Sequence, residues 1–152
     1  MRAPFQVLVL PYTRASHGGY RYAIFRRAPE TGCYWQGLAG GGEAGESPLD
    51  AAKREAWEEA GISTASNFTS LASMVTIPVV QVSGFLWGRD LLVIPEYSFG
   101  VEVFTQKLSL SAEHTRYRWL SFESAHHALR WDSNKNALWE LELRLQTARD
   151  YG

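Results

Sequence analysis

The sequence predicts an α/β fold in which a mixed β-sheet lies between helices. Strand-like runs of β-branched and aromatic residues recur as far as about residue 120, and three helical stretches occur among and after them. Strands and helices do not alternate strictly, which favours a mixed sheet over a purely parallel one. The length of 152 residues and the hydrophobic content of 45% suit one domain with its own core. We therefore expect a single domain over residues 1–152.

The first third of the chain predicts a β-hairpin followed by a glycine-rich loop. Residues 5–10 and 20–25 are rich in strand-forming residues, and residues 16–19 between them have turn composition. Residues 31–42 combine glycines with aromatic residues and end in three consecutive glycines. We interpret this end of the segment as a glycine loop.

A helix is predicted directly after this loop. Ser47 is a good N-cap, Pro48 suits the first turn, and Asp50 completes a capping-box pattern. Gly61 has the composition of a C-terminal cap, so the helix should end there. Small and apolar side chains recur on the face that we expect to pack against the sheet, namely Leu49, Ala52, Ala56 and Ala60.

The second half of the chain predicts further strands and two more helices. The strands are expected at residues 68–77, 82–87, 97–104 and 116–120. The helices are expected at residues 122–129 and 133–148. The last helix carries apolar residues at helical spacing, which indicates a face that packs on the core: Ala137, Leu138, Leu141 and Leu145.

Composition excludes several classes of partner. The net charge of −1 argues against a general nucleic-acid binder and against a polybasic membrane module. The apolar run at residues 7–10 stops at Pro11 and is too short for a signal peptide or a membrane span. Cys33 is the only cysteine, which excludes an intrachain disulfide and suits a reducing compartment. We expect a cytoplasmic protein without nucleic-acid or membrane partners.

Negative charge is concentrated in one segment of this nearly neutral chain. Residues 40–62 contain six acidic and two basic residues, a net charge of −4, whereas the rest of the chain has a net charge of +3. Within that segment Glu55, Glu58 and Glu59 are spaced so that their carboxylates share one helix face. A hard divalent cation, which prefers oxygen ligands, would offset the repulsion between them. A solvated acidic face would show the same three residues, so the cluster alone leaves both interpretations open.

The spacing of the whole segment is more specific than the cluster. It fits G-x5-E-x7-R-E-U-x-E-E-x-G-U, where U is apolar, with every fixed position filled, and the residues concerned are Gly40, Glu46, Arg54, Glu55, Ala56, Glu58, Glu59, Gly61 and Ile62. This pattern resembles the Nudix box, with Ala56 a small choice for an apolar position. The resemblance implies a Nudix α/β/α sandwich. It also implies a Mg²⁺- or Mn²⁺-assisted hydrolase that cleaves a nucleoside diphosphate linked to another group.

The resemblance also implies roles for individual box residues. Glu58 and Glu59 match metal ligands, and Glu55 matches either a ligand or the base that activates water. The backbone carbonyl of Ala39 or Gly40 would complete the coordination.

Other box positions match structural roles. Glu46 and Arg54 are expected to form an ion pair that holds the loop against the helix. Gly40 and Gly61 are the fixed glycines of the pattern.

Motifs outside the box resemble those of bacterial dihydroneopterin triphosphate pyrophosphatases and related dATP pyrophosphohydrolases, and they lie in residues 23–27, 34–37, 113–120 and 131–135. By this resemblance Glu113 is a further metal ligand or base, and Arg26 and Arg2 contact substrate phosphates. Trp35, which lies beside the glycine loop, and Gly40 are candidates to contact the substrate. The alternatives are a solvated loop acid for Glu113, a surface arginine for Arg26 and a core position for Trp35.

Two other functions stay open at this point. Pro78 lies sixteen positions after Ile62, a placement that resembles ADP-ribose pyrophosphatases, although a proline in this place also suits an ordinary turn. A Nudix fold that binds a nucleotide without hydrolysing it is the alternative from another class. The intact box carboxylates favour the enzyme, whose expected partner is a small phosphorylated molecule. A homodimer is compatible with the sequence.

Overall fold

The computed structural model describes residues 1–29 and 32–151, with only the backbone described at residues 115 and 149–151. Within these ranges seven strands form one sheet: β1 (Arg2–Arg14), β2 (Tyr20–Arg27), β3 (Trp35–Gln36), β4 (Leu38–Glu43), β5 (Asn67–Pro78), β6 (Val93–Glu102) and β7 (His114–Leu120). The helices are α1 (Pro48–Ala60), the short 3-10 helix η2 (Val79–Gln81), α2 (Phe122–Ala128) and α3 (Asp132–Tyr151).

Strand β1 is the central strand of the sheet and changes partner along its length. Its first half pairs antiparallel with β4, and its last residues pair antiparallel with β2. Its other edge pairs in parallel with β6, from Gln6 opposite Glu96 to Tyr12 opposite Glu102. The sheet is therefore mixed, as predicted.

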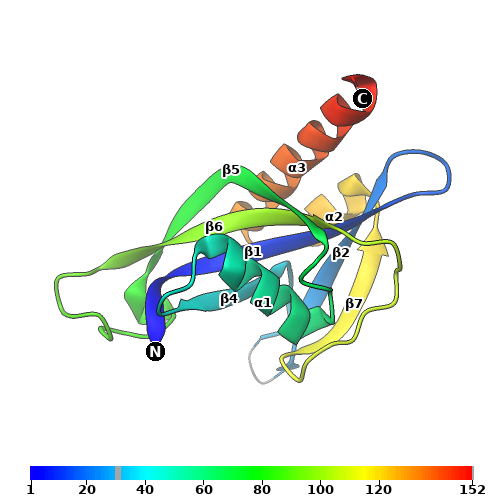
Figure 1. The fold of residues 1–152 in the computed structure, drawn as a ribbon. Helices are drawn as coiled ribbons and strands as arrows, with labels where there is room; N and C mark the ends of the chain where they lie inside the picture. The colour runs from blue at the N-terminus through cyan, green and yellow to red at the C-terminus, as the bar shows by residue number, and fades with distance from the viewer. Residues whose placement is uncertain (30–31, 152) are drawn as a thin grey trace.

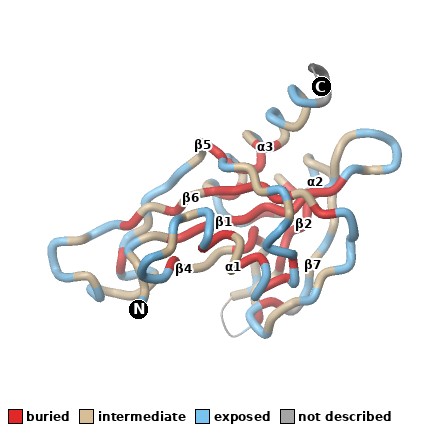
Figure 2. Tube along the Cα trace, viewed as in Figure 1, coloured by how far each residue is buried: buried red, intermediate tan, exposed pale blue. Residues whose placement is uncertain are grey.

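Helices cover both faces of this sheet (Figure 1). Successive side chains of β1 alternate between the faces, so that Val7 and Val9 pack with the alanines of α1. Leu8 and Leu10 pack instead with Leu138 and other residues of α2 and α3. Figure 2 shows the central strands as buried segments between these layers. The predicted α/β/α sandwich is confirmed.

Helix α1 begins and ends where the sequence predicts. The Ser47 hydroxyl accepts a hydrogen bond of 3.1 Å from the Asp50 amide. Gly61 adopts a left-handed conformation with φ of 68°, which terminates the helix. Ala52, Ala56 and Ala60 are buried as expected, but Leu49 is 39% exposed, so its predicted place on the packing face is wrong.

Two segments differ from the predicted elements. Residues 82–87 form turns after η2 instead of a strand, because the Val79 carbonyl accepts three successive amides there and Gly84 has φ of 63°. Residues 38–43, expected to end in a glycine loop, form β4, whose glycines pair with β1. The lack of side chains at residues 40–42 leaves room for Arg2, Phe5 and Glu55 to approach this strand.

Strand β5 lies at the edge of the sheet and is irregular between Ser70 and Met74. The Glu140 carboxylate of α3 accepts the amides of Ala72 and Ser73 at 2.7 Å and the Ser73 hydroxyl at 2.6 Å. Burial opposes ionisation, but these hydrogen bonds and the Arg144 guanidinium lower the pKa of Glu140 to about 2. Glu140 thus fastens α3 to the irregular part of β5.

Candidate active site

A cleft of about 990 Å³ runs across the edge of the sheet at β4. At one end, which we call the acidic end, it is lined by Glu55, Glu58, Glu59 and Glu113. Its other lining residues include two contacting pairs, Gln6 with Glu96 and Tyr34 with Trp131, which we name together the distal end. The cleft therefore brings together residues from both halves of the chain.

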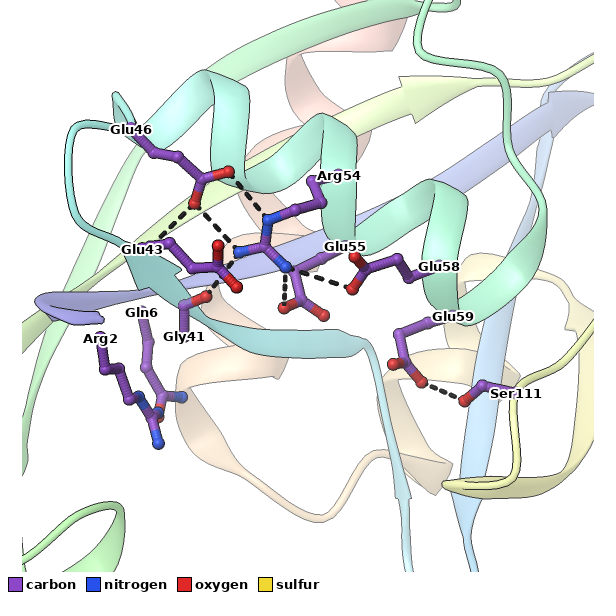
Figure 3. A network of polar contacts seen from close by, with 10 residues as sticks. All are labelled: Arg2, Gln6, Gly41, Glu43, Glu46, Arg54, Glu55, Glu58, Glu59 and Ser111. Carbon is purple, nitrogen blue, oxygen red and sulfur yellow. Dashed lines mark hydrogen bonds and ion pairs between the residues drawn. The ribbon is translucent and has the colours of Figure 1, made fainter.

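Arg54 is the centre of the acidic end. Its Nε donates to Glu46 at 2.8 Å and its Nη2 donates to the second Glu46 oxygen at 3.0 Å, so the pair is bidentate. The same Nη2 donates to the Gly41 carbonyl at 2.9 Å. The hydrogen bonds that Arg54 donates to Glu46 lower the pKa of Glu46. Burial opposes this effect, and the hydrogen bond from the Glu43 amide adds to it. The ion pair expected from the box is present and connects β4, the following loop and α1 (Figure 3).

Arg54 also reaches the carboxylates of α1. Its Nη1 lies 3.0 Å from Glu55 Oε1 and 3.2 Å from Glu58 Oε2. Glu55 is 8% exposed, whereas the Glu58 side chain is about half exposed. Burial raises the pKa of Glu55 to about 7, an effect that Arg54 opposes and the charges of Glu59 and Glu58 reinforce. Glu55 is thus a carboxyl group able to exchange a proton near neutral pH.

Gly40 fixes the position of the Glu55 carboxylate. A Cβ atom at residue 40 would lie 2.1 Å from Glu55 Cδ and 2.3 Å from each carboxylate oxygen, which is too close for any side chain. Because the fixed glycine of the box has no side chain, the buried Glu55 carboxylate can pack directly against the backbone of β4.

Glu59 on α1 and Glu113 in the segment just before β7 complete the acidic end. The Glu59 carboxylate accepts a hydrogen bond from the Ser111 hydroxyl and lies 3.6 Å from His114 Nδ1. Burial, and then the charge of Arg27, lower the pKa of His114, against an opposing effect of Glu113. Glu113 itself is exposed and lies 3.9 Å from Arg27 Nη1.

The donor atoms of the acidic end fit a hard divalent cation. Four carboxylates and the backbone oxygens of β4 are the ligand type that Mg²⁺ and Mn²⁺ prefer. In the residues that the structure describes, no three His, Cys, Asp or Glu side chains are already grouped as a metal site. Arg54 instead forms ion pairs with Glu55 and Glu58. A bound cation would have to coordinate carboxylates that Arg54 also contacts.

Two of the predicted substrate-contacting residues do not line the cleft. Arg26 is absent from its lining, whereas the neighbouring Arg27 is part of it. Trp35 packs with the α2 and α3 side of the core, and its ring lies 6.0 Å from Arg118 Cζ. The aromatic residues that line the cleft are Tyr34 and Trp131, whose rings meet edge-on at 5.2 Å. Arg26 and Trp35 therefore do not line this cleft, and their contact with the substrate stays a prediction.

Arg2 and Gly40 do lie in the cleft, as expected. Sequence reasoning missed Gln6 and Glu96, which are 9% and 6% exposed and also line it. The available signal was a polar residue within each of two otherwise buried strands. A buried polar residue with no partner nearby in sequence is a candidate for tertiary pairing or ligand contact.

The protein is similar to known proteins in sequence and in fold. The model of the NUDIX domain family matches residues 7–140. The crystal structure of a protein from Listeria monocytogenes described as a NUDIX hydrolase is 38% identical, with a TM-score of 0.85 over 96% of this chain and 97% of that one. The dihydroneopterin triphosphate pyrophosphohydrolase of E. coli has the same fold, with a TM-score of 0.73 at 22% identity over 94% of this chain and 97% of that one.

Two curated proteins are also similar in sequence. The dihydroneopterin triphosphate diphosphatase of Haemophilus influenzae is 24% identical over 135 residues, which cover 87% of this chain and 83% of that protein. The octanoyltransferase of Myxococcus xanthus is 34% identical over 111 residues, which cover 69% of this chain. The match spans only 28% of the octanoyltransferase, so octanoyl transfer is not carried over to this chain.

The matched family and fold define a hydrolase that acts on acid anhydrides in phosphorus-containing substrates. Because the family model covers most of its length, the chain belongs to the Nudix family. The resemblance drawn from the box is thereby confirmed, as is the expectation of an enzyme. Among the described helices, none combines the length and apolar composition needed to cross a bilayer.

Proposed function

We propose that the protein is a divalent-metal-dependent pyrophosphohydrolase of nucleoside triphosphate-like substrates. The substrate would be dihydroneopterin triphosphate or a (deoxy)nucleoside triphosphate, and the products would be the monophosphate and pyrophosphate. The observation that carries the proposal is the cleft at β4, which has carboxylates at its acidic end and aromatic and amide side chains at its distal end. Such a cleft suits a molecule with a charged polyphosphate and a planar heterocycle. We place this activity in one cytoplasmic domain.

The acidic end would hold the metal, either Mg²⁺ or Mn²⁺. The proposed ligands are the carboxylates of the acidic end and the backbone carbonyl of Ala39 or Gly40. When bound, the cation would supply charge neutralisation for the phosphates and polarise the anhydride.

The residues of the chain would position and deprotonate the water. Glu55, a buried carboxylate, is one candidate to accept the proton, a role that it would take in place of binding the cation. Water would then form a bond to phosphorus as the bond to the pyrophosphate oxygen breaks. Glu113, which also lines the acidic end, is the other candidate base. Arg2 and Arg27 line the cleft and would contact the phosphates.

A hydrolysis screen with and without Mg²⁺ tests this proposal. The panel contains dihydroneopterin triphosphate, dATP, 8-oxo-dGTP and ADP-ribose, and release of pyrophosphate or monophosphate is measured. We expect Mg²⁺-dependent release of pyrophosphate from the triphosphates, abolished by a chelator. Binding without turnover would instead identify a non-catalytic module.

ADP-ribose or a nucleotide sugar is the second candidate substrate. Pro78 lines the cleft at the end of β5, where it can contact a bound substrate. A clear preference for ADP-ribose in the screen would assign Pro78 to substrate recognition and displace the triphosphate proposal.

A further inference from the structure

Gln6 and Glu96 form a buried polar pair in the cleft. They lie opposite each other on the parallel strands β1 and β6. The residues next to them, Phe5 and Tyr97, point to the α1 face, where their rings meet at 6.1 Å. Because side chains alternate along a strand, Gln6 and Glu96 lie on the opposite face of the sheet. This is the face that also carries α3, whose first residues line the same cleft.

A chain of hydrogen bonds fixes the orientation of the pair. Arg2 Nη2 donates to Gln6 Oε1 at 3.2 Å, and Gln6 Nε2 donates to Glu96 Oε2 at 3.3 Å. The guanidinium has only donors, so the amide oxygen must face Arg2 and the amide nitrogen must face Glu96. Figure 3 shows Arg2 and Gln6 side by side below β4, away from the Arg54 cluster. In these two hydrogen bonds Glu96 is therefore the final acceptor.

Glu96 can accept more hydrogen bonds than the one that Gln6 donates to it. A carboxylate has about four lone-pair sites, and the amide of Gln6 fills one. Burial raises the pKa of Glu96, with the hydrogen bond from Gln6 opposing it. The neighbour of Glu96 on β5 is Val75, an apolar side chain that lines the cleft and offers no donor. N–H donors supplied by a ligand in the cleft would stabilise the ionised carboxylate.

We propose that Glu96 is a specificity-determining residue that recognises a heterocycle with two adjacent N–H donors. The amino-oxo edge shared by guanine and pterins has such a pair, a ring N–H beside the exocyclic 2-amino group. Adenine presents an amino group beside a ring nitrogen that only accepts, and this lone pair would face the carboxylate. This inference rests on the proposed function, which places the substrate phosphates at the acidic end. Among the proposed triphosphate substrates, it selects those whose heterocycle has this amino-oxo edge.

The test is a comparison of dihydroneopterin triphosphate, dGTP and dATP in three proteins. These are the unmodified protein, Glu96→Gln and, as a matched control, Glu102→Gln. Glu102 lies on the same strand outside the cleft lining, where it pairs with Arg14 at 3.8 Å. We expect Glu96→Gln to lower kcat/KM for dihydroneopterin triphosphate and dGTP by roughly tenfold to a hundredfold, mainly through KM. The value for dATP should change by less than about threefold, and Glu102→Gln should leave all three unchanged.

A second variant guards against misfolding of the first. Gln6→Leu keeps the carboxylate and removes the amide that orients it, so we expect the same selectivity change at about threefold to tenfold. Equal losses for all three substrates in both variants would show a structural role and overturn the proposal. Unchanged selectivity would overturn it as well.

Failure of the proposed function gives a different result. In that case the unmodified protein hydrolyses none of the three triphosphates. Calorimetric binding of GMP and AMP then tests Glu96 directly. Weaker GMP binding in Glu96→Gln, with AMP binding unchanged, would support the assignment, and equal binding of both nucleotides by the unmodified protein would refute it.

Discussion

The two ends of the cleft differ in how far apart their residues lie in the sequence. At the acidic end Arg54 contacts Gly41, 13 residues away, and the carboxylates of α1 follow within one helix. At the distal end Gln6 contacts Glu96, 90 residues away. Local spacing therefore brings together Arg54 and the α1 carboxylates at the first end, to which the tertiary fold adds Glu113, whereas the tertiary fold assembles the second end. This difference predicts that substitutions at the acidic end change turnover and those at the distal end change substrate affinity.

The largest effect is expected for Glu58→Gln. Removing one charged oxygen from the proposed metal site should lower kcat by about 10²–10³-fold. The melting temperature should stay unchanged because the Glu58 side chain is half exposed. Initial rates at saturating Mg²⁺ and a thermal unfolding curve measure the two quantities. Activity close to that of the unmodified protein would defeat the metal assignment.

Gly40→Ala should have the next largest effect. The new methyl group would overlap the Glu55 carboxyl group, so the Glu55 side chain must move away from the backbone of β4. We expect kcat to fall by about tenfold to a hundredfold and the free energy of unfolding to fall by about 1–3 kcal/mol. A double-mutant cycle with Glu55→Ala provides the control, since the shorter side chain removes the clash. If Gly40→Ala destabilises both backgrounds equally, Glu55 is not the cause.

Trp131→Ala probes the distal end. Loss of a stacking surface should raise KM for the triphosphate substrate by about tenfold while leaving kcat within about twofold. Trp139→Ala is the matched control, since Trp139 is an exposed tryptophan of α3 that does not line the cleft. A fall in kcat without a change in KM would contradict the division of roles between the two ends.

Glu140→Gln should have the smallest effect and should change stability alone. Glu140 holds α3, whose first residues line the cleft, against β5. The folded protein lowers the pKa of Glu140 from 4.5 to about 2, so its ionised form stabilises the fold above pH 4.5. We expect unfolding in urea to show a loss of about 1–2 kcal/mol at pH 7. The difference from the unmodified protein should shrink below pH 4.5 and vanish near pH 2. A constant difference across this range would rule out the carboxylate as its source.

The sequence predicted the parts of the molecule that local chemistry controls. The α1 caps at Ser47 and Gly61 and the pairing of Glu46 with Arg54 depend on residues close in the chain, and all are present. Residues 82–87 look like a strand because they are apolar, but no neighbouring strand pairs with them within the described residues. Composition cannot report whether such a partner exists.

The substrate contacts show the same limit. Arg26 and Arg27 are equivalent in composition, and only the register of β2 decides which one faces the cleft. No local sequence signal links Gln6 to Glu96, because their pairing arises from the parallel contact of β1 with β6.

That parallel contact also sets the order in which the molecule can be built on the ribosome. Once residue 60 has been synthesised, β1, β2, β4 and α1 all exist and can pair locally. Strand β6 begins only at Val93, so one long edge of β1 stays without its partner until then. Non-local pairing of this kind is slow and leaves strand edges open to other chains. A nascent chain arrested before residue 93 would therefore leave this edge of β1 open to pairing with other chains.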